Sequence, residues 1–372
     1  MIELANVTKR YENNIAVRNL FLSVNEGEVC TLIGPSGCGK STTIKLINRM
    51  LDPENGEIFV QGKNIRDFKP EALRRQIGYV IQYVGLFPHM SVAENIGIVP
   101  KMLGWEKAVI HRRVDELLGL VDLDPARYRN TYPHELSGGE AQRIGVARAL
   151  AADPPVLLMD EPFGAVDPLT REVLQAEFIK IQKALKKTVV FVTHDIDEAV
   201  RLADRIALMR GGGIVQHDTP ENILAHPLNK FVHDFVGTDR ALKRLSRFTV
   251  GKIMRKDNSV VLMDSGTAGF EKPRGKKALR FLWVLDNNRR LLGWVDTSEI
   301  VENAPLAEAM TDVRNSQFGV REDATLREAL SRMLGEGVKA IPVLDYESRV
   351  VGEIGLKDIE KVTEETERQW KE

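Results

Sequence analysis

One glycine-rich segment has the residue types and spacing needed to hold a chain of phosphates. Residues 34–41 read Gly-Pro-Ser-Gly-Cys-Gly-Lys-Ser and match the pattern G-x-x-x-x-G-K-[ST] without a mismatch. Glycines let the backbone wrap the phosphates with its N–H groups inward, while Lys40 reaches the outer phosphates and the Ser41 hydroxyl binds Mg2+. An ordinary strand-to-helix turn is the alternative. The residues that we expect to contact the nucleotide here are Gly34, Pro35, Ser36, Gly37, Cys38, Gly39, Lys40, Ser41 and Thr42.

Two adjacent carboxylates could complete a site for phosphate hydrolysis. Asp160 and Glu161 directly follow the apolar run 155–159. Asp160 can hold Mg2+ directly or through water, and Glu161 would project toward the attacking water and polarise it as a general base. The alternative is an acidic helix start, with Pro162 at an early helical position. Together with the phosphate loop, the pair favours the hydrolytic interpretation.

A histidine stands at the end of a third apolar run. His194 follows residues 188–193, which read as a strand. A single histidine after a strand is usually structural or exposed. In open α/β sheets, however, strand ends line the ligand crevice, so we expect His194 to contact the γ-phosphate.

Short β-branched runs that alternate with helical patterns must position these residues. Residues 28–33, 155–160 and 187–192 are candidate buried strands, and they indicate a mostly parallel sheet covered on both faces. The predicted fold class of residues 1–236 is therefore an α/β P-loop NTPase.

The remainder of the chain contains an internal repeat with an offset of about 59 residues. Val284-Leu285-Asp286 matches Val343-Leu344-Asp345, and Leu292-Gly293 matches Val351-Gly352. Two copies of a small α+β unit fit this pattern. The predicted segments are an NTPase domain at 1–236, a linker at 237–247, a degenerate first repeat at 248–305, a second repeat at 306–362 and a charged tail at 363–372.

Composition excludes several classes of protein. The chain has 372 residues, 43% hydrophobic and 28% charged, which is typical of a globular protein with two or three domains. A formal net charge of −1 argues against a general nucleic-acid binder, and two cysteines cannot form a disulfide framework. Neither a signal peptide nor an apolar run of membrane-spanning length is present, so we expect any membrane span to lie on a partner.

A second motif lies between the phosphate loop and the carboxylate pair. Residues 132–143 read Tyr-Pro-His-Glu-Leu-Ser-Gly-Gly-Glu-Ala-Gln-Arg and resemble the signature motif of ABC-transporter ATPases. The resemblance covers the whole first block. It implies that Tyr11 stacks on adenine, that Gln82 is the Q-loop glutamine at the Mg2+, that Asp167 belongs to the D-loop and that His194 is the switch histidine. It also implies catalytic roles for Glu161, His194, Lys40 and Gln82, and metal ligation by Ser41, Gln82 and Asp160.

The resemblance further implies a head-to-tail dimer with ATP and Mg2+ between the chains. The phosphate loop of one chain would face Ser137, Gly138 and Gly139 of the other, where glycines and a helix N-terminus surround the γ-phosphate. Glu140, where many members have Gln, would add negative charge near the partner's nucleotide. We expect a homodimer, with a heterodimer of close relatives as the alternative.

Residues 78–105 and the appended repeats most resemble ATP-binding subunits of quaternary-amine importers. Such a subunit powers uptake of glycine betaine, carnitine, choline or proline-type osmolytes. It works with transmembrane permease subunits and an extracytoplasmic substrate-binding protein, peripherally on the cytoplasmic face of the membrane. The resemblance makes an apolar patch after Gln82 the contact for the permease: Val84, Leu86, Phe87, Pro88 and His89. A soluble ABC ATPase, an importer ATPase for another small solute and a regulatory nucleotide-binding protein without turnover are the alternatives.

The repeats resemble a tandem CBS pair, whose ligand the sequence leaves open. The family pattern G-x-V-T-x-x-D-L lacks its Thr in both copies, while its Asp is kept as Asp358 and replaced by Glu299. Residues 265–277 are rich in glycine where the second copy is helical. Adenine mononucleotide binding, a dimerisation or sensing role with a cyclic dinucleotide, and a purely structural role therefore remain open.

Charge is uneven along this second block. Residues 240–290 contain 14 basic and 4 acidic residues, a net of +10, whereas residues 291–372 carry a net of −8. Mutual neutralisation of the two zones is one interpretation. The other is contact of the basic zone, including Lys272, Arg274 and Lys276–Lys277, with an anionic lipid or ligand, which salt would weaken.

Overall fold

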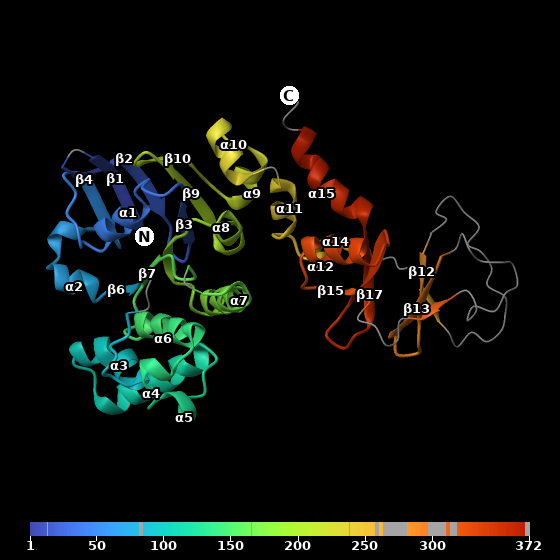
Figure 1. The fold of residues 1–372 in the computed structure, drawn as a ribbon, viewed down its shortest axis with the longest axis horizontal. Helices are drawn as coiled ribbons and strands as arrows, with labels where there is room; N and C mark the ends of the chain where they lie inside the picture. Colours follow the sequence, from blue (N-terminus) through green and yellow to red (C-terminus); the bar gives the residue numbers. More distant parts are fainter. Residues whose placement is uncertain are drawn as a thin grey trace, which may run out of the picture. The chain divides into compact units, whose positions relative to one another are not determined.

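The protein, represented by a computed structural model, divides into two compact units, Met1–Gly237 and Thr238–Glu372 (Figure 1). The structure describes residues 1–12, 14–81, 85–164, 166–237, 239–256, 260–262, 281–296, 310–312 and 318–368. Within these residues, no helix is both long enough and apolar enough to cross a membrane.

A six-stranded sheet forms the centre of the first unit. Its strand order is β10 (Gly213–Asp218), β9 (Arg205–Arg210), β3 (Val29–Ile33), β8 (Thr188–Val192), β7 (Val156–Asp160) and β6 (Ile77–Val80). All neighbours pair in parallel except β9 and β10, which are antiparallel. Every residue of β3 and β8 is buried, which explains their continuous apolar sequences.

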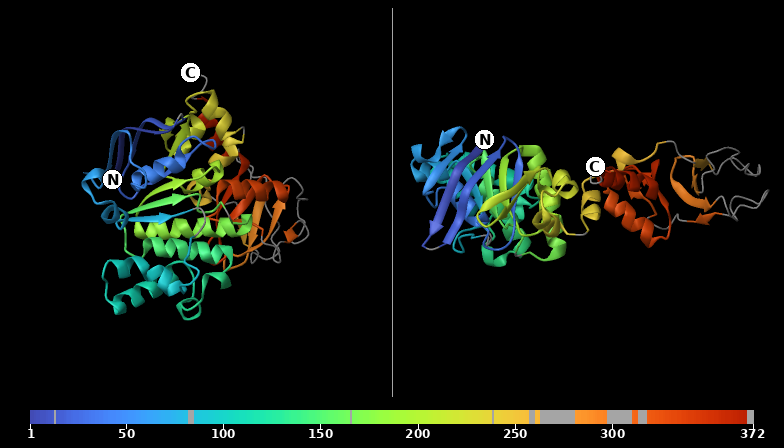
Figure 2. Two further views of the ribbon diagram at one scale, coloured as in Figure 1. Left: turned by 60° about the vertical axis from the view of Figure 1, so that its left-hand side comes forward. Right: turned by 90° about the horizontal axis from the view of Figure 1, so that it is seen from above.

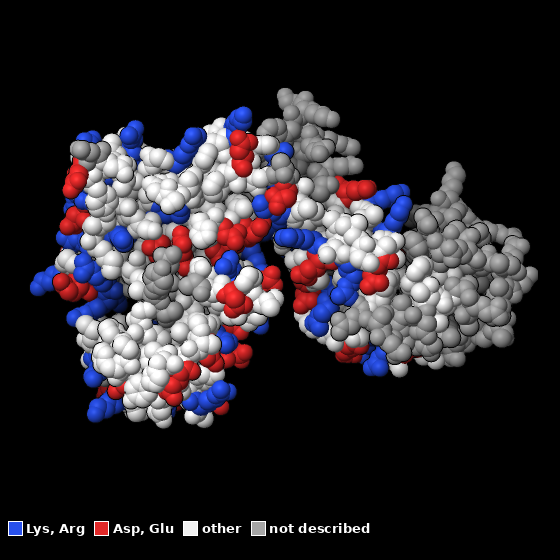
Figure 3. All heavy atoms as spheres, viewed as in Figure 1, with Lys and Arg blue, Asp and Glu red and all other residues white. Residues whose placement is uncertain are grey.

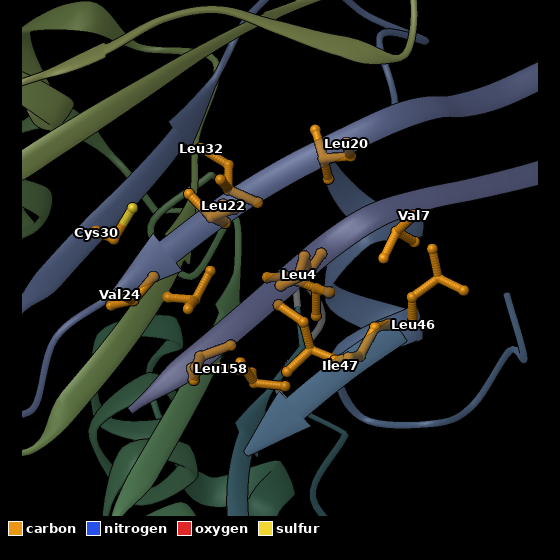
Figure 4. Packing of buried hydrophobic residues seen from close by; sticks show 14 of the residues in the cluster. Leu4, Val7, Leu20, Leu22, Val24, Cys30, Leu32, Leu46, Ile47 and Leu158 are labelled. Carbon is orange, nitrogen blue, oxygen red and sulfur yellow. The ribbon is translucent and has the colours of Figure 1, made fainter. Parts of the chain in front are cut away.

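An antiparallel sheet packs over one face of the central sheet. Its order is β2 (Asn14–Val24), β1 (Ile2–Tyr11), β4 (Asn55–Val60) and β5 (Lys63–Asn64). The core between the two sheets includes side chains from β1, β2, β3, β7 and α1 (Lys40–Ile47), such as Leu4, Leu22, Leu32, Leu158 and Ile47 (Figure 4). This core anchors the strand and the helix that flank the phosphate loop.

Helices cover the central sheet and form a subdomain beside it. The subdomain contains α3 (Val92–Met102), α4 (Lys107–Leu120), α5 (Pro125–Tyr128) and α6 (Gly138–Leu150). Figure 2 shows α6 and α7 (Pro168–Leu185) side by side below the sheet. The shorter elements are the 3-10 turns Ile65–Asp67 and Pro133–Glu135, and the helices α2 (Pro70–Arg74), α8 (Ile196–Leu202), α9 (Pro220–Ala225) and α10 (Lys230–Val236).

The described part of the second unit repeats one strand pattern twice. One sheet is β11 (Val260–Leu262), β12 (Phe281–Leu285), β13 (Leu291–Asp296) and β14 (Thr311–Asp312), and the other is β15 (Val320–Arg321), β16 (Ala340–Leu344) and β17 (Val350–Gly355). Val284 pairs with Gly293, and Val343 pairs with Gly352, so the register repeats at an offset of 59 residues. The helices are α11 (Arg240–Leu245), α12 (Val250–Ile253), α14 (Leu326–Gly335) and α15 (Leu356–Arg368).

The segment predicted as a linker contributes to the core of the second unit. Leu245 of α11 is buried in the cluster that contains Trp283 and Ile341, and α11 contacts α14 and α15. The glycine-rich stretch 265–277 and Glu299 lie outside the described residues. The predicted α/β NTPase fold followed by an α+β CBS region is confirmed.

Candidate functional site

The phosphate loop joins buried strand β3 to helix α1 through backbone that only glycine adopts without strain. Gly34 has φ 153° and Gly39 has φ 107°. A Cβ at Gly34 would lie 2.2 Å from the carbonyl oxygen of Met209, and one at Gly39 would lie 2.3 Å from that of Ala16. Both glycines are therefore required by close backbone approach as well as by conformation.

Two polar side chains of the loop are held at the start of α1. The ammonium of Lys40 is buried and donates to the carbonyl oxygens of Gly34 at 2.7 Å and Pro35 at 3.1 Å. The Ser41 hydroxyl donates to Asp160 Oδ1 at 3.1 Å. The Lys40 ammonium is thus placed as a cation for phosphates, and the Ser41 hydroxyl, paired with the Asp160 carboxylate, offers oxygen ligands of the kind that Mg2+ requires.

Asp160 and Glu161 stand at the carboxyl end of β7. Burial raises the pKa of Asp160, while the Ser41 hydrogen bond opposes that shift. A partly desolvated carboxylate beside a hydroxyl fits a Mg2+ ligand, because the cation compensates the charge that burial disfavours. The oxygen donors present thus match a hard divalent cation.

The raised pKa of Asp160 leads to a prediction about stability. Between the ordinary value of 3.8 and the raised folded value, the folded state binds more protons than the unfolded chain. The free energy of unfolding therefore falls as pH rises through that window. We expect Asp160→Asn to raise the Tm of the nucleotide-free chain by about 2 °C at neutral pH, because the variant removes a disfavoured charge. Scanning calorimetry measures the shift, and the exposed Asp67→Asn is the control. An unchanged or lower Tm would contradict the prediction.

Glu161 is brought to His194 by the adjacency of β7 and β8. Glu161 has φ 46°, and its N–H donates to the carbonyl of Val192 at 3.0 Å. Its Oε2 lies 3.3 Å from His194 Nδ1. The glutamate side chain is 22% exposed and the histidine side chain 65%, so the pair reaches solvent on the ligand side of the sheet. A carboxylate and an imidazole are therefore paired at this edge of the sheet.

The signature residues form the N-terminus of α6. Ser137 caps the helix: its hydroxyl accepts from the Glu140 N–H at 3.3 Å, and Glu140 Oε2 accepts from the Ser137 N–H at 2.7 Å. Tyr128 donates to the other Glu140 oxygen at 2.5 Å, and this hydrogen bond is the main cause of the lowered pKa of Glu140. Both Glu140 oxygens are thus engaged within the chain. Sequence reasoning missed Tyr128.

The glycines of the signature differ in their surroundings. A Cβ on Gly138 would meet nothing within 4 Å, whereas one on Gly139 would lie 2.7 Å from Thr170 Cγ2. Gly139 therefore packs α6 on α7, and Gly138 leaves an open surface at the helix N-terminus. That surface is accessible to a second molecule.

The remaining predicted residues lie on separate elements. Asp167 caps α7 by accepting from the Thr170 N–H at 3.0 Å. Hydrogen bonding with the Thr170 side chain, and then with its backbone, lowers the pKa of Asp167. Tyr11 ends β1 and is 45% exposed, and the Lys9 ammonium lies 5.9 Å from the centre of its ring. Gln82 lies outside the described residues.

An apolar groove of about 460 Å3 lies at the junction of the sheet edge and the helical subdomain. Its exposed apolar side chains are Met50 at 48%, Ile81 at 38%, Phe87 at 41% and Met102 at 60%. Of the patch predicted after Gln82, Phe87 lines the groove, Leu86 packs toward the core and Val84 is outside the described residues. Met50 and Met102 were not predicted.

On the visible face, basic and acidic side chains are interspersed over both units (Figure 3).

The second unit has a cleft of about 1050 Å3 between its described strands and α14. Arg290, Arg321 and Arg332 line it together with Asp323 and Glu328. Asp358, the residue expected on a ribose, lies elsewhere and is engaged within the chain. It is 8% exposed and accepts from the Gly355 N–H at 2.9 Å and from Arg255 at 3.1 Å. Both contacts are made to Asp358 Oδ2.

The phosphate loop, the carboxylate pair and the capped signature helix together define an ATPase of the ABC class. A family profile described as ABC transporter matches residues 17–164, and one described as CBS domain matches residues 307–365. Among solved structures, a dimeric post-hydrolysis ATP-binding cassette bound to ADP and phosphate is similar. It has a TM-score of 0.53 and 35% identity over 59% of this chain and 98% of that chain.

Relatives match nearly the whole chain. The glycine betaine/carnitine/choline transport ATP-binding protein OpuCA of Bacillus subtilis is 46% identical over 95% of this chain and 93% of its own length. The osmoprotectant import ATP-binding protein OsmV of Salmonella typhimurium is 46% identical over 95% of this chain and 94% of its own length. The chain therefore belongs to the family of ABC-type ATP-binding subunits of osmoprotectant importers, as the sequence predicted.

Proposed function

We propose that this chain hydrolyses ATP to power import of quaternary-amine compatible solutes, such as glycine betaine, carnitine, choline or proline betaine, through a membrane permease. The observation that carries the proposal is the hydrolytic site, within a chain that is 46% identical over 95% of its length to subunits named for such transport. The same names support a peripheral location on the cytoplasmic face and a role in osmoprotection.

In this proposal, the chain's residues divide the work of hydrolysis. Lys40 and the loop N–H groups hold the phosphates, and Ser41 and Asp160 hold Mg2+, which neutralises charge on the phosphate oxygens. Glu161 accepts a proton from the attacking water, and His194 orients Glu161 and contacts the γ-phosphate. Tyr11 would stack on adenine, and Gln82 would be a further ligand to Mg2+. The spacing of Ser41, Asp160, Glu161 and His194 supports these roles.

The site is completed by a second chain. The α6 N-terminus is exposed and open at Gly138, and its dipole favours an anion. Within one chain, Ser137 and Glu140 bond with each other, Glu140 also accepts from Tyr128, and Lys40 donates to its own loop. We therefore infer a head-to-tail dimer in which Ser137, Gly138, Gly139, Glu140 and Asp167 approach the partner's nucleotide. Two copies of this chain would form such a dimer without any other ATPase chain. A heterodimer of this chain with a close relative would form the same site.

The apolar groove is the proposed contact for the permease. Its lining includes Ile81, which directly precedes Gln82 in the sequence and follows β6, the strand that pairs with β7. Because β7 ends at Asp160, an inserted helix would lie near the nucleotide site. Its exposed methionines adapt well to a partner's side chains. Such a contact transmits closure of the ATPase dimer to the membrane subunits. A substrate-binding protein would deliver solute on the other side of the membrane.

A charge placed in the groove tests this contact. We expect Met102→Glu to weaken co-purification with the cognate permease by about tenfold or more, because a desolvated carboxylate opposes an apolar interface. Basal ATP hydrolysis of the isolated subunit should stay within about twofold, since the side chain is 60% exposed in the isolated chain. Leu228→Glu, at a comparably exposed leucine outside the groove, is the control. Equal permease binding by both variants would contradict the assignment.

Transport in proteoliposomes tests the solute class. The subunit, its permease and its binding protein are reconstituted, and uptake of labelled glycine betaine, carnitine, choline and proline betaine is measured with internal ATP. ATP-dependent uptake of at least one supports the proposal. Uptake of only another solute would favour a different importer, and absence of a permease partner would favour a soluble ABC ATPase.

The proposed role of the second unit is to regulate transport by sensing an anionic ligand, a cyclic dinucleotide or an adenine nucleotide. The three arginines of the cleft outnumber its two acidic residues, Asp323 and Glu328, and support an anion, while Arg321 is paired with Asp323 at 3.2 Å. The contacts of Asp358 Oδ2 with Gly355 and Arg255 compete with a ribose hydroxyl for that oxygen. Titration of the full chain with each compound by calorimetry, with Lys40→Ala to suppress binding at the phosphate loop, distinguishes them. The proposed lipid contact of Lys272, Arg274, Lys276 and Lys277 falls outside the described residues.

A further inference from the structure

Three ligand-type side chains meet far from the nucleotide site. Glu28, Cys30 and His217 each offer one ligand atom, and these atoms lie within 4.8 Å of one another. Glu28 precedes β3, Cys30 lies near the amino end of β3, and His217 lies on edge strand β10. The phosphate loop follows the opposite end of β3, so none of these residues serves hydrolysis.

Strand register explains why Cys30 and His217 meet. The intervening strand β9 pairs Arg205 with Cys30 and Ala207 with His217. Paired residues project to the same face, and so do residues two apart on one strand. Cys30 and His217 therefore share a face across β9, and the small side chain of Ala207 leaves room for them to approach.

The distance between the two side chains suits a metal ion. Cys30 Sγ lies 3.8 Å from His217 Nε2. Zinc bonds of about 2.3 Å to sulfur and about 2.1 Å to nitrogen, at a tetrahedral angle, separate the two atoms by about 3.6 Å. The pair is therefore nearly preformed for a tetrahedral ion.

Glu28 supplies a buried carboxylate with spare capacity. The residue is 8% exposed, and its Oε2 accepts from the N–H and the amide of Asn25 at 3.0 and 2.7 Å. Its Oε1 is buried and has no hydrogen-bond partner within the described structure. A buried carboxylate oxygen without a partner is costly, so a bound cation would remove that cost.

Burial favours the metal-binding form of His217 and disfavours that of Cys30. Burial lowers the pKa of His217, which keeps the imidazole neutral and able to ligate. Burial raises the pKa of the Cys30 thiol, and the Glu28 carboxylate adds to that shift. A metal ion would displace the thiol proton, and the charges of the thiolate and Glu28 would balance a divalent cation. Arg205, which donates to the His217 carbonyl at 3.0 Å, opposes the cation and limits its affinity.

We propose that Glu28, Cys30 and His217 form a binding site for a thiophilic divalent cation of the Zn2+ class, with water as the fourth ligand. Sulfur, imidazole and one carboxylate favour Zn2+ over Mg2+ or Ca2+, which prefer oxygen ligands. The ion would cross-link β3 to edge strand β10. Entry is from the side of His217, which is partly exposed, whereas Cys30 is fully buried.

Cobalt serves as the probe, because a thiolate bound to Co2+ gives a sulfur-to-metal charge-transfer absorption that oxygen ligands do not. The full chain is titrated with Co2+ in excess Mg2+, and Zn2+ is then added to displace the cobalt. We expect the charge-transfer band to appear and Zn2+ to abolish it. His217→Gln and Cys30→Val should each weaken Co2+ affinity by more than the roughly 10–100-fold that loss of an outer-shell partner typically costs.

Matched variants assign the band to this site. Cys38→Ser removes the other cysteine and should leave the band unchanged. Glu28→Gln keeps an oxygen for Asn25 and should weaken affinity through loss of charge. His217→Gln alone decides the question if Cys30→Val fails to fold. Absence of the band at saturating Co2+, an unchanged Co2+ affinity in His217→Gln, or loss of the band in Cys38→Ser would each overturn the proposal.

Discussion

The Glu161→Gln variant is expected to bind ATP with Mg2+ but to hydrolyse it about 10²–10⁴-fold more slowly than the parent, the range for loss of a general base. Gln keeps the size and the hydrogen-bonding oxygen that faces His194 at 3.3 Å, but it cannot accept a proton from water. The backbone at this position has φ 46°, and Gln replaces Glu without changing the backbone preference substantially. Phosphate release under single-turnover and steady-state conditions measures the effect.

Two comparisons separate chemistry from folding in that experiment. Glu57→Gln makes the same substitution at an exposed position of β4 and should retain parent activity within about twofold. ATP affinity and Tm of Glu161→Gln should match those of the parent. Hydrolysis by Glu161→Gln at the parent rate would show that another group activates the water.

Much of the hydrolytic site could be predicted because its parts lie in contiguous motifs. Ser41 and Asp160 are 119 positions apart, yet Asp160 ends β7 and Ser41 begins the helix that follows β3 and its loop. The carboxyl ends of parallel strands lie at one sheet edge, where the loops that follow them meet. The contact between Glu161 and His194 follows from the pairing of β7 with β8. The sequence predicted the two strands but not their adjacency.

Features assembled from distant segments without a motif were not predicted. Met50 and Met102 follow α1 and end α3, and in the sequence each looks like an ordinary apolar helix residue. Only the tertiary arrangement leaves them exposed around one groove. Similarly, Cys30 and His217 are 187 positions apart, and their approach depends on the register of β9 with both neighbours. The periodicity of side chains along the sequence does not predict how these strands align with one another.

The sequence predicted the charge of Glu140 but not the hydrogen bonds that its carboxylate makes within its own chain. A carboxylate at this position reads as added charge near a partner's nucleotide. In the structure the carboxylate closes a capping box with Ser137 and accepts from Tyr128, a residue of the preceding short helix α5. The negative charge therefore sits in a hydrogen-bonded position at its own helix start, where it complements the helix dipole.

The Gly138→Asp variant is expected to leave each chain folded but to lower ATP hydrolysis by at least about 10²-fold, comparable to loss of one preorganised oxyanion donor. A side chain at Gly138 meets nothing within 4 Å in the chain itself, and a carboxylate in the first turn of a helix is favourable. Facing a partner's γ-phosphate, the same carboxylate repels the charge that the helix N-terminus would otherwise stabilise. Tm should therefore stay close to the parent value while turnover and ATP-dependent dimerisation are lost.

A matched control and a mixing experiment make this prediction specific to a shared site. Gly119→Asp introduces the same residue at an exposed glycine of α4 that also has nothing within 4 Å, and it should keep parent activity. Mixing Gly138→Asp chains with Lys40→Ala chains creates dimers in which one site combines an intact phosphate loop with an intact signature. Such mixtures should recover ATP-dependent dimerisation and hydrolysis at that site, which neither variant achieves alone. Because complementation requires Lys40 and Gly138 of one site to come from different chains, full activity of Gly138→Asp alone, or failure of the mixture to recover dimerisation and hydrolysis, would refute the head-to-tail arrangement.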